Sequence, residues 1–263
     1  MEPVIQLERA TKDYGRERGV FDLSFAVERG EVVGFLGANG AGKSVTMRLL
    51  MGFVRPSSGR VLIGGRDCFA DRARIQRSVG YLPGELACPS DLTGRAFLDF
   101  VAAMRGARDH RRRDELTEFF ELDPSARIRS MSKGTKQKLG IVAAFMGAPD
   151  VLLLDEPTSG LDLLMQRRFV ELVRAERARG ATVLLSSHVL GEVEGTCDRA
   201  IFIRRGHLSS RAQASDLTLD ATLERLYGAE ALGRHWEGDA SAASAASAAF
   251  DSPSAASSKG GRS

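Results

Sequence analysis

Residues 37–44 read Gly37-Ala38-Asn39-Gly40-Ala41-Gly42-Lys43-Ser44, and they fit the pattern G-x-x-x-x-G-K-[ST] without a substitution. An apolar, β-branched segment at 31–36 precedes this loop, and the segment at 45–50 opens as a helix. A strand, a glycine loop and a helix N-terminus together turn backbone N–H groups towards a bound polyphosphate. A chance match in a chain of this length would occur about one time in a hundred. The stretch therefore predicts a nucleoside triphosphate site.

Each residue type in the loop has a physical task. Glycines let the backbone approach the phosphates without a Cβ in the way. Lys43 supplies a positive charge for the β and γ phosphates, and the Ser44 hydroxyl is suited to ligate magnesium. We expect the nucleotide to be bound by Gly37, Asn39, Gly40, Ala41, Gly42, Lys43, Ser44 and, through its backbone N–H, Val45.

A second motif is acidic. The apolar segment Val151–Leu154 ends in Asp155-Glu156-Pro157, and such a strand presents its carboxylates at the carboxyl edge of the sheet, beside the phosphate loop. We expect Asp155 to hold magnesium through water and Glu156 to orient and deprotonate an attacking water. The alternative is an ordinary acidic turn that caps the next helix. The co-occurrence with the phosphate loop favours the catalytic interpretation.

The composition is that of a globular protein, with 43% hydrophobic and 27% charged residues among 263. This length suits one large domain or two small ones. The net charge of +3 is too small to indicate nucleic acid binding. No apolar run approaches the roughly 18 residues of a membrane span, and the N-terminus has no signal core, so we expect a cytoplasmic location. The three cysteines are widely spaced and form neither a metal pattern nor a disulfide framework.

Hydrophobic periodicity indicates the fold class. Apolar residues alternate along residues 4–8 and 19–27, as they do in strands. Strand-like and helix-like segments then alternate along residues 151–186, which is typical of a parallel sheet covered by helices. The sequence therefore predicts an α/β core with a mostly parallel sheet.

A helical insert interrupts the strand-rich parts. Apolar residues recur at helical spacing between residues 92 and 122, and we place this subdomain at about 85–140. We expect one domain over residues 1–228 and a disordered Ala/Ser-rich tail over residues 229–263. A basic cluster within the insert has acidic residues interspersed, which favours a solvated helix start or loop over a surface for RNA or anionic lipid. It consists of Arg105, Arg108, His110, Arg111, Arg112 and Arg113.

Further segments carry a family resemblance. The run Asp155-Glu156-Pro157-Thr158-Ser159-Gly160-Leu161-Asp162 closely resembles the Walker B and D-loop run of ATP-binding cassette (ABC) ATPases. The run Met131-Ser132-Lys133-Gly134-Thr135-Lys136-Gln137-Lys138 resembles the ABC signature motif, and Ser186-Ser187-His188 resembles the switch histidine. Tyr14 stands where the family has the aromatic residue that stacks on adenine. Together with the phosphate loop, these motifs occur in the family's order over roughly residues 4–210.

The resemblance implies a fold and a reaction. The fold would be a P-loop NTPase core with a mostly parallel sheet, an N-terminal antiparallel β subdomain and a helical insert. The reaction would be hydrolysis of ATP with Mg²⁺ between two cassettes arranged head to tail. Ser132 and Gly134 would contact the partner's nucleotide from the side opposite the phosphate loop. Asp162 would couple the two sites, and His188 would contact the γ-phosphate.

The chain departs from the family pattern at several positions. In the signature-like run, Lys133 and Thr135 replace the usual glycine and glutamine, and Val45 replaces a frequent threonine in the phosphate loop. Gly84 stands where the family usually has a glutamine that touches magnesium and links the helical insert to the nucleotide. Our hypothesis is that Glu85 takes over part of this role.

The motifs look most like those of exporter ATPases, including drug and antibiotic efflux systems. The resemblance therefore implies an ATP-hydrolysing subunit on the inner face of the cell membrane. It would pair with a copy of itself or a paralogue and power export through a separate polytopic permease, with no nucleic acid partner. The alternative is a soluble ABC ATPase that acts on ribosomes or DNA, but such proteins usually carry two cassettes or a long coiled-coil insertion, and this chain shows neither.

Overall fold

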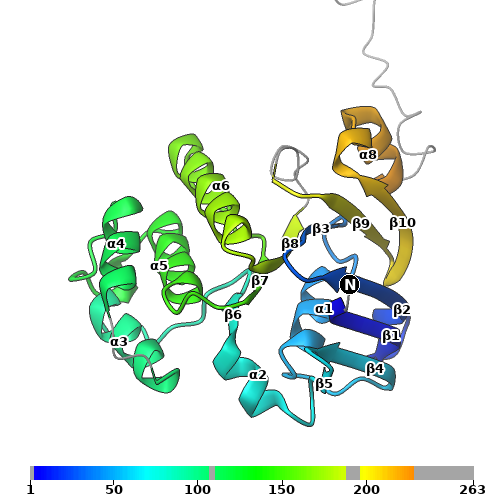
Figure 1. Ribbon diagram of the computed structural model, residues 1–263, viewed down its shortest axis with the longest axis horizontal. Helices are drawn as coiled ribbons and strands as arrows, with labels where there is room; N and C mark the ends of the chain where they lie inside the picture. Colours follow the sequence, from blue (N-terminus) through cyan, green and yellow to red (C-terminus); the bar gives the residue numbers. More distant parts are fainter. Residues whose placement is uncertain (1–2, 107–109, 188–195, 228–263) are drawn as a thin grey trace, which may run out of the picture.

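The computed structural model describes residues 3–106, 110–187 and 196–227 (Figure 1). The strands are β1 (Pro3–Asp13), β2 (Gly19–Glu28), β3 (Val32–Leu36), β4 (Ser58–Ile63), β5 (Arg66–Asp67), β6 (Val79–Leu82), β7 (Val151–Asp155), β8 (Thr182–Ser187), β9 (Arg199–Arg204) and β10 (His207–Gln213). The helices are α1 (Lys43–Leu50), α2 (Arg72–Ser78), α3 (Gly94–Met104), α4 (Arg111–Phe119), α5 (Lys133–Phe145), α6 (Leu163–Ala178) and α8 (Leu219–Tyr227). Two short 3₁₀ turns cover Ile128–Ser130 and Ala214–Asp216.

The larger sheet has the strand order β10-β9-β3-β8-β7-β6. Its pairs are parallel from β9 through β6, and β10 joins the edge antiparallel to β9. Every residue of β3, β7 and β8 is buried, as expected for parallel strands that are covered on both faces. The predicted α/β core with a mostly parallel sheet is confirmed.

The sheet separates two hydrophobic cores. Side chains point alternately to the two faces of a strand. Along β7, Val151 and Leu153 lie in the core that also contains the buried face of α1, whereas Leu152 and Leu154 lie in the core beneath α5 and α6. The strand that ends at the two acids is therefore held from both sides.

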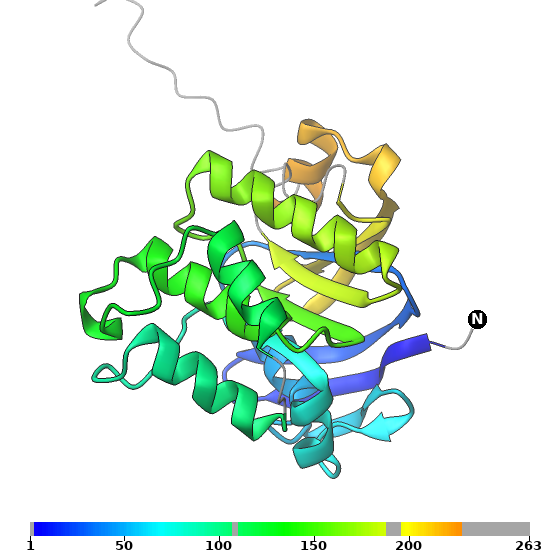
Figure 2. The same ribbon diagram turned by 60° about the vertical axis from the view of Figure 1, so that its left-hand side comes forward.

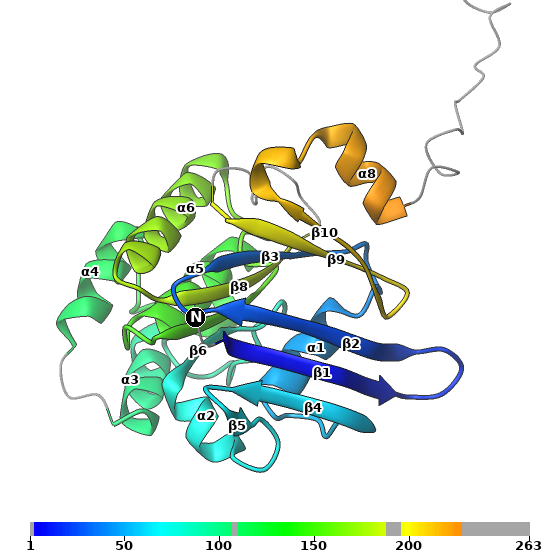
Figure 3. The same cartoon turned by 45° about the vertical axis from the view of Figure 1, so that its right-hand side comes forward.

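The smaller sheet is antiparallel, with the order β2-β1-β4-β5. Figure 3 shows it in front of α1, so that α1 lies between the two sheets. From Leu23 to Val27 alternate residues of β2 are buried, which is the pattern of a strand with one face on the core. The predicted N-terminal antiparallel β subdomain is confirmed.

Helices α3, α4 and α5 gather at the side of the molecule away from β1 and β2 (Figures 1 and 2). They share the core beneath α6 through buried residues such as Leu98, Leu116 and Leu139. This layer is the helical insert that the sequence predicts. The domain limits at residues 85–140 and 1–228 stay predictions, and the Ala/Ser-rich segment at 229–263 lies outside the described residues.

Part of the basic cluster is structural, so its interpretation as a solvated helix start was wrong for three residues. The Arg105 guanidinium donates to the carbonyl of Ala143 (3.2 Å), and burial lowers its pKa. Arg112 donates to the carbonyl of Phe145 (3.1 Å), and Arg113 is buried with its guanidinium paired to carboxylates. For Arg105 and Arg112 the physical reason is that carbonyls in the last turn of α5 have no partner within the helix, and cations satisfy them. Arg113 is held by the carboxylates of Asp99 and Asp114.

Cys68, Cys88 and Cys197 form no disulfide with one another. Burial, with a smaller contribution from the charge of Asp67, raises the pKa of Cys68 to about 12. Burial also raises the pKa of Cys88 to about 11, against an opposing effect of Lys136. Thiols with such pKa values stay protonated near neutral pH and react slowly.

Within the described ranges, none of the helices combines the length and the hydropathy of a membrane span.

Candidate functional site

The phosphate loop connects β3 to α1, and glycines determine its path. Gly40 and Gly42 have φ values of +80° and +112°, in the left-handed region that favours glycine. A Cβ on Gly42 would lie 2.6 Å from a methyl of Val20, and one on Gly37 would lie 2.8 Å from the carbonyl oxygen of Ile203. Larger residues would therefore displace the loop from the neighbouring strands.

Lys43 is the first residue of α1, and its side chain is only 6% exposed. Its Nζ donates to the carbonyl of Gly37 (2.6 Å) and lies 3.0 Å from Oε1 of Glu156. The two predicted motifs thus meet in one ion pair. When a polyphosphate enters this loop, the Lys43 ammonium can leave the single carboxylate of Glu156 and bind the phosphate oxygens instead.

An open cleft of about 1590 Å³ surrounds this ion pair. It exceeds the roughly 300–1,000 Å³ of typical small-molecule pockets, so a nucleotide fits within it. The predicted site residues that line the cleft are Tyr14, Asn39, Gly40, Ala41, Gly42, Lys43, Ser44, Val45 and Glu156. The structure therefore brings together most of the residues predicted to bind the nucleotide and the predicted general base.

The end of β7 holds the two acids in different ways. Asp155 is buried, and its Oδ1 accepts a hydrogen bond from the Ser186 hydroxyl (2.5 Å). Glu156 follows with a φ of +49°, and its N–H donates to both the carbonyl (3.2 Å) and the hydroxyl (3.1 Å) of Ser186. The chain turns at this point, so that Glu156 reaches Lys43 while Asp155 stays within the sheet edge.

The segment after β6 lies beside Asp155. A Cβ on Gly84 would stand 3.4 Å from Oδ2 of Asp155, and both Gly84 and Glu85 line the cleft. Burial and the charge of Asp155 raise the pKa of Tyr81 to about 12, against an opposing effect of Arg48. Position 84 thus faces the acid, where a longer side chain could reach a metal. A compensating role for Glu85 stays a prediction.

Several predicted site residues do not line the cleft; they are Gly37, Ser132, Gly134, Asp155 and Asp162. Ser132 caps α5 by accepting the N–H of Thr135 (3.1 Å), and Asp162 caps α6 by accepting an N–H of its first turn (2.9 Å). Their contacts with a second cassette stay predictions. His188 lies outside the described residues.

Four further side chains that line the cleft were not predicted from the sequence: the guanidinium groups of Arg18, Arg48 and Arg205, and the imidazole of His207. Arg48 follows Ser44 by four residues, so helical spacing could have revealed it. Arg205 sits in the turn between β9 and β10 with a φ of +48°, and its position depends on the sheet order. No local pattern marks it.

The residues at the loop and the sheet edge also fit a magnesium ion. The Ser44 hydroxyl and the Asp155 carboxylate offer oxygen ligands, which Mg²⁺ prefers. In the described part of the chain no group of three or more His, Cys, Asp or Glu forms a metal cluster of its own. This donor set suits an ion held by one or two protein oxygens together with substrate phosphates.

Comparison with known families agrees with this geometry. The family model described as ABC transporter matches residues 20–159, more than half of the chain. The chain belongs to the ABC transporter family. It is an ABC ATPase, a cassette that binds ATP and hydrolyses it.

Two relatives of this ABC ATPase are ATP-binding proteins of bacilli. The bacitracin transport ATP-binding protein BcrA of Bacillus licheniformis is 35% identical over 79% of this chain and 69% of its own length. The linearmycin resistance ATP-binding protein LnrL of Bacillus subtilis (strain 168) is 34% identical over 81% of this chain and 70% of its own. Among solved structures, an ATP-binding subunit of an ABC transporter matches with a TM-score of 0.76 and 28% identity, over 83% of this chain and 97% of that one.

Proposed function

We propose that this ABC ATPase uses Glu156 to hydrolyse ATP and thereby powers export through a separate membrane permease. The observation that carries the catalytic part is the contact between Lys43 Nζ and Glu156 Oε1, 3.0 Å apart inside the cleft. It supports the proposal because a phosphate-binding cation and a general base must share one site. The names of the two relatives, which concern bacitracin transport and linearmycin resistance, support the export part.

Binding of ATP exchanges the partner of Lys43. The ammonium leaves the Glu156 carboxylate for the β and γ phosphates, whose charge is higher. Glu156 is then released to orient and deprotonate the water that attacks the γ-phosphate. Tyr14, which is half-exposed at the mouth of the cleft, stacks on adenine. A magnesium ion bound to Ser44 and, through water, to Asp155 would neutralise charge on the phosphates.

Hydrolysis in this proposal requires a second cassette, either a copy of this chain or a paralogue. The phosphate loop covers one side of the nucleotide, and Ser132 and Gly134 of the partner approach from the other side. Asp162 couples the two sites, and His188 contacts the γ-phosphate. ATP closes the pair and hydrolysis reopens it, which gives two states that the γ-phosphate selects.

The permease would dock on the helical layer. On α3 the side chains of Phe100 and Met104 are 57% and 64% exposed, and large apolar side chains gathered on a surface indicate protein contact. Docking there would hold the ATPase on the inner face of the cell membrane. No nucleic acid partner is required.

The test uses the Glu156→Gln variant, which should bind ATP and hydrolyse it at least about 1,000-fold more slowly, as expected for loss of a general base and its water. The tagged variant is expressed in its native host, and membranes are extracted in mild detergent with and without ATP. Recovery of a polytopic membrane protein together with the variant supports the proposal.

The matched control is Glu171→Gln, which removes an exposed carboxylate of α6 that pairs with Arg167 outside the cleft. This control should hydrolyse ATP at the wild-type rate. Recovery of ribosomal or DNA-repair proteins with Glu156→Gln, and of nothing from the membrane, would overturn the transporter assignment. Unchanged hydrolysis by Glu156→Gln would overturn the catalytic assignment.

A further inference from the structure

We propose that Gln137 is a positioning residue for Glu156, through which helix α5 sets the orientation of the catalytic carboxylate. The inference rests on the proposed role of Glu156 and gives a role to a residue of the signature-like run that does not line the cleft. It also joins the helical layer to the hydrolytic site by a defined contact.

Gln137 lies in the second turn of α5, and only 4% of it is exposed. Its Nε2 donates to the carbonyl of Pro157 (2.8 Å) and to that of Glu156 (3.2 Å). A buried primary amide has a high desolvation cost and is retained where its hydrogen bonds are made. Both donations of this amide go to the turn that carries the general base.

The backbone of Glu156 needs such support. A non-glycine residue with a φ of +49° lies in the left-handed region, a strained conformation that persists where surrounding contacts over-determine it. The N–H of Glu156 is held by Ser186 of β8, and its carbonyl is held by Gln137 of α5. The two flanking peptide groups are therefore clamped from two different elements, and a shift of either element re-aims the side chain.

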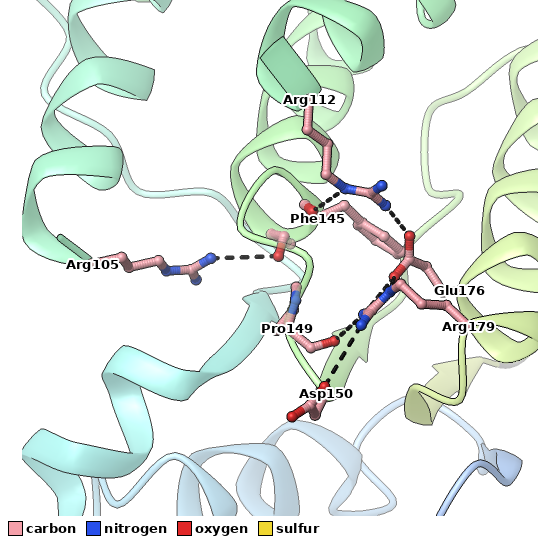
Figure 4. A network of polar contacts seen from close by, with 8 residues as sticks. Arg105, Arg112, Phe145, Pro149, Asp150, Glu176 and Arg179 are labelled. Carbon is pink, nitrogen blue, oxygen red and sulfur yellow. Dashed lines mark hydrogen bonds and ion pairs between the residues drawn. The ribbon is translucent and has the colours of Figure 1, made fainter. Parts of the chain in front are cut away.

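The other end of α5 is tied to the helical layer, as Figure 4 shows. The guanidinium groups of Arg105, at the end of α3, and Arg112, on α4, donate to carbonyls of the last turn of α5. Arg112 also pairs with the buried carboxylate of Glu176 on α6, whose other oxygen accepts from Arg179 (2.8 Å). A movement of α3 and α4 would therefore displace the 13-residue helix α5, and with it Gln137.

The experiment compares Gln137→Leu with the wild type in steady-state hydrolysis and in equilibrium binding of a fluorescent ATP analogue. We expect kcat to fall about 10- to 100-fold because the carboxylate is misaimed, while Kd changes less than about twofold because the phosphate loop is untouched. Gln137→Met, which keeps the length of the side chain and removes both donors, should give the same loss of kcat and serves as the second variant.

The decisive readout is non-additivity. If Gln137 acts through the Glu156 carboxylate, adding Gln137→Leu to Glu156→Gln should leave the residual single-turnover rate unchanged within about twofold. A full multiplicative loss in the double variant would overturn the proposal. So would loss of ATP-dependent dimerisation in the double variant, because Gln137 would then act on the signature-like segment instead.

The matched control is Gln76→Leu. Gln76 of α2 also donates its amide to a backbone carbonyl, that of Met51 (3.0 Å), but it does not contact the cleft or Glu156. Its kcat should equal that of the wild type, and an equal fall in both glutamine variants would overturn the proposal in favour of a general loss of packing. The rate of Glu156→Gln relative to wild type tests the proposed function separately, so the two failures are distinguishable.

Discussion

The phosphate loop and the Glu156 turn face each other across one cleft, yet they are built differently. Lys43 bonds to the carbonyl of Gly37, six positions earlier, within one uninterrupted motif. Glu156 is held by Gln137, 19 positions earlier, and by Ser186, 30 positions later. The loop has its main side-chain contact within the motif, although Gly37 and Gly42 also pack against Ile203 and Val20, whereas the turn is held only by contacts with distant elements.

Because of this difference, we expect nucleotide binding and hydrolysis to respond differently to movement of the helical layer. A site for phosphate assembled from neighbours in sequence responds little to movement elsewhere in the molecule. Glu156, the proposed general base, is held by Ser186 of β8 and Gln137 of α5, so we expect it to respond to displacement of the helical layer. In the proposed mechanism, the cassette would therefore hold ATP in more than one arrangement and hydrolyse it in the one that orients Glu156.

The largest expected effect tests the local half of this comparison. Lys43→Met removes the charge from the loop and should weaken ATP binding at least about 100-fold, since each hydrogen bond to a charged group contributes roughly 1.5–3 kcal/mol. Titration with a fluorescent ATP analogue measures it. Arg74→Met, which removes an exposed cation of α2, is the control and should bind as the wild type does. Tight binding by Lys43→Met would mean that the cleft is not the nucleotide site.

An intermediate effect tests the contacts between distant residues that hold the helical layer to α5 and α6. Glu176 is 2% exposed and bridges Arg112 and Arg179, each about one third exposed. Breaking a buried ion pair costs about 3–5 kcal/mol, and the exposure of both arginines reduces this, so Glu176→Gln should lower the free energy of unfolding by about 2 kcal/mol. Denaturant titration measures the change, and ATP binding should not change.

Glu171→Gln, on the exposed side of the same helix, is the matched comparison. Its partner Arg167 is four residues earlier and both side chains are solvated, so the change should be within about 0.5 kcal/mol. Equal destabilisation of the two variants would show that the Glu176 network contributes no more to the free energy of unfolding than an exposed ion pair does.

The smallest expected effect concerns Glu31, the residue before β3, whose carboxylate accepts hydrogen bonds from the distant Arg199. Burial alone would raise the pKa of Glu31, but hydrogen bonds from Arg199 and the N–H of Glu28, with the charge of Arg199, lower it below 4.5. A lowered pKa in the folded state means that the charge stabilises the protein above the unfolded pKa, and that this stabilisation is lost as pH falls through the folded value.

We therefore expect Glu31→Gln to lower the free energy of unfolding at pH 7 by about 1 kcal/mol. The difference from the wild type should narrow as the pH falls below about 4.5. Denaturant titrations of both proteins at pH 7 and in acid measure it. A difference that stays constant with pH would contradict a charge-dependent contact.

The sequence predicted what contiguous residues encode. Strand 31–36, the loop and α1 were expected from one stretch, and the alternation at 19–27 corresponds to β2 within a residue at its end. The segment at 4–8 identified β1 but missed its second half, because Arg9 with a φ of +46° and the bulges that follow break the alternation. Helix α6 begins at Leu163 because Asp162 caps it, and the alternation along residues 151–186 does not mark this start.

The contacts that no local pattern encodes were missed. Gln137 lies within the signature-like run, but a glutamine on a helix is expected to be at the surface. Its burial depends on the turn after β7, whose carbonyls accept its amide hydrogens. Arg105 and Arg112 were grouped with their charged neighbours, because their carbonyl partners at Ala143 and Phe145 lie more than thirty residues away. The roles of the predicted site residues stay predictions until the variants above are measured.

The raised thiol pKa values have a practical consequence for labelling. A thiol with a pKa of about 11 is ionised in roughly one molecule in 10,000 at pH 7, and Cys68, with a pKa of about 12, is ionised less still. Cys197 is buried. An exposed cysteine introduced by L163C, at the 82% exposed start of α6, would ionise several hundred times more readily than Cys88. Maleimide dyes should therefore label this one position selectively in a chain that keeps its native cysteines.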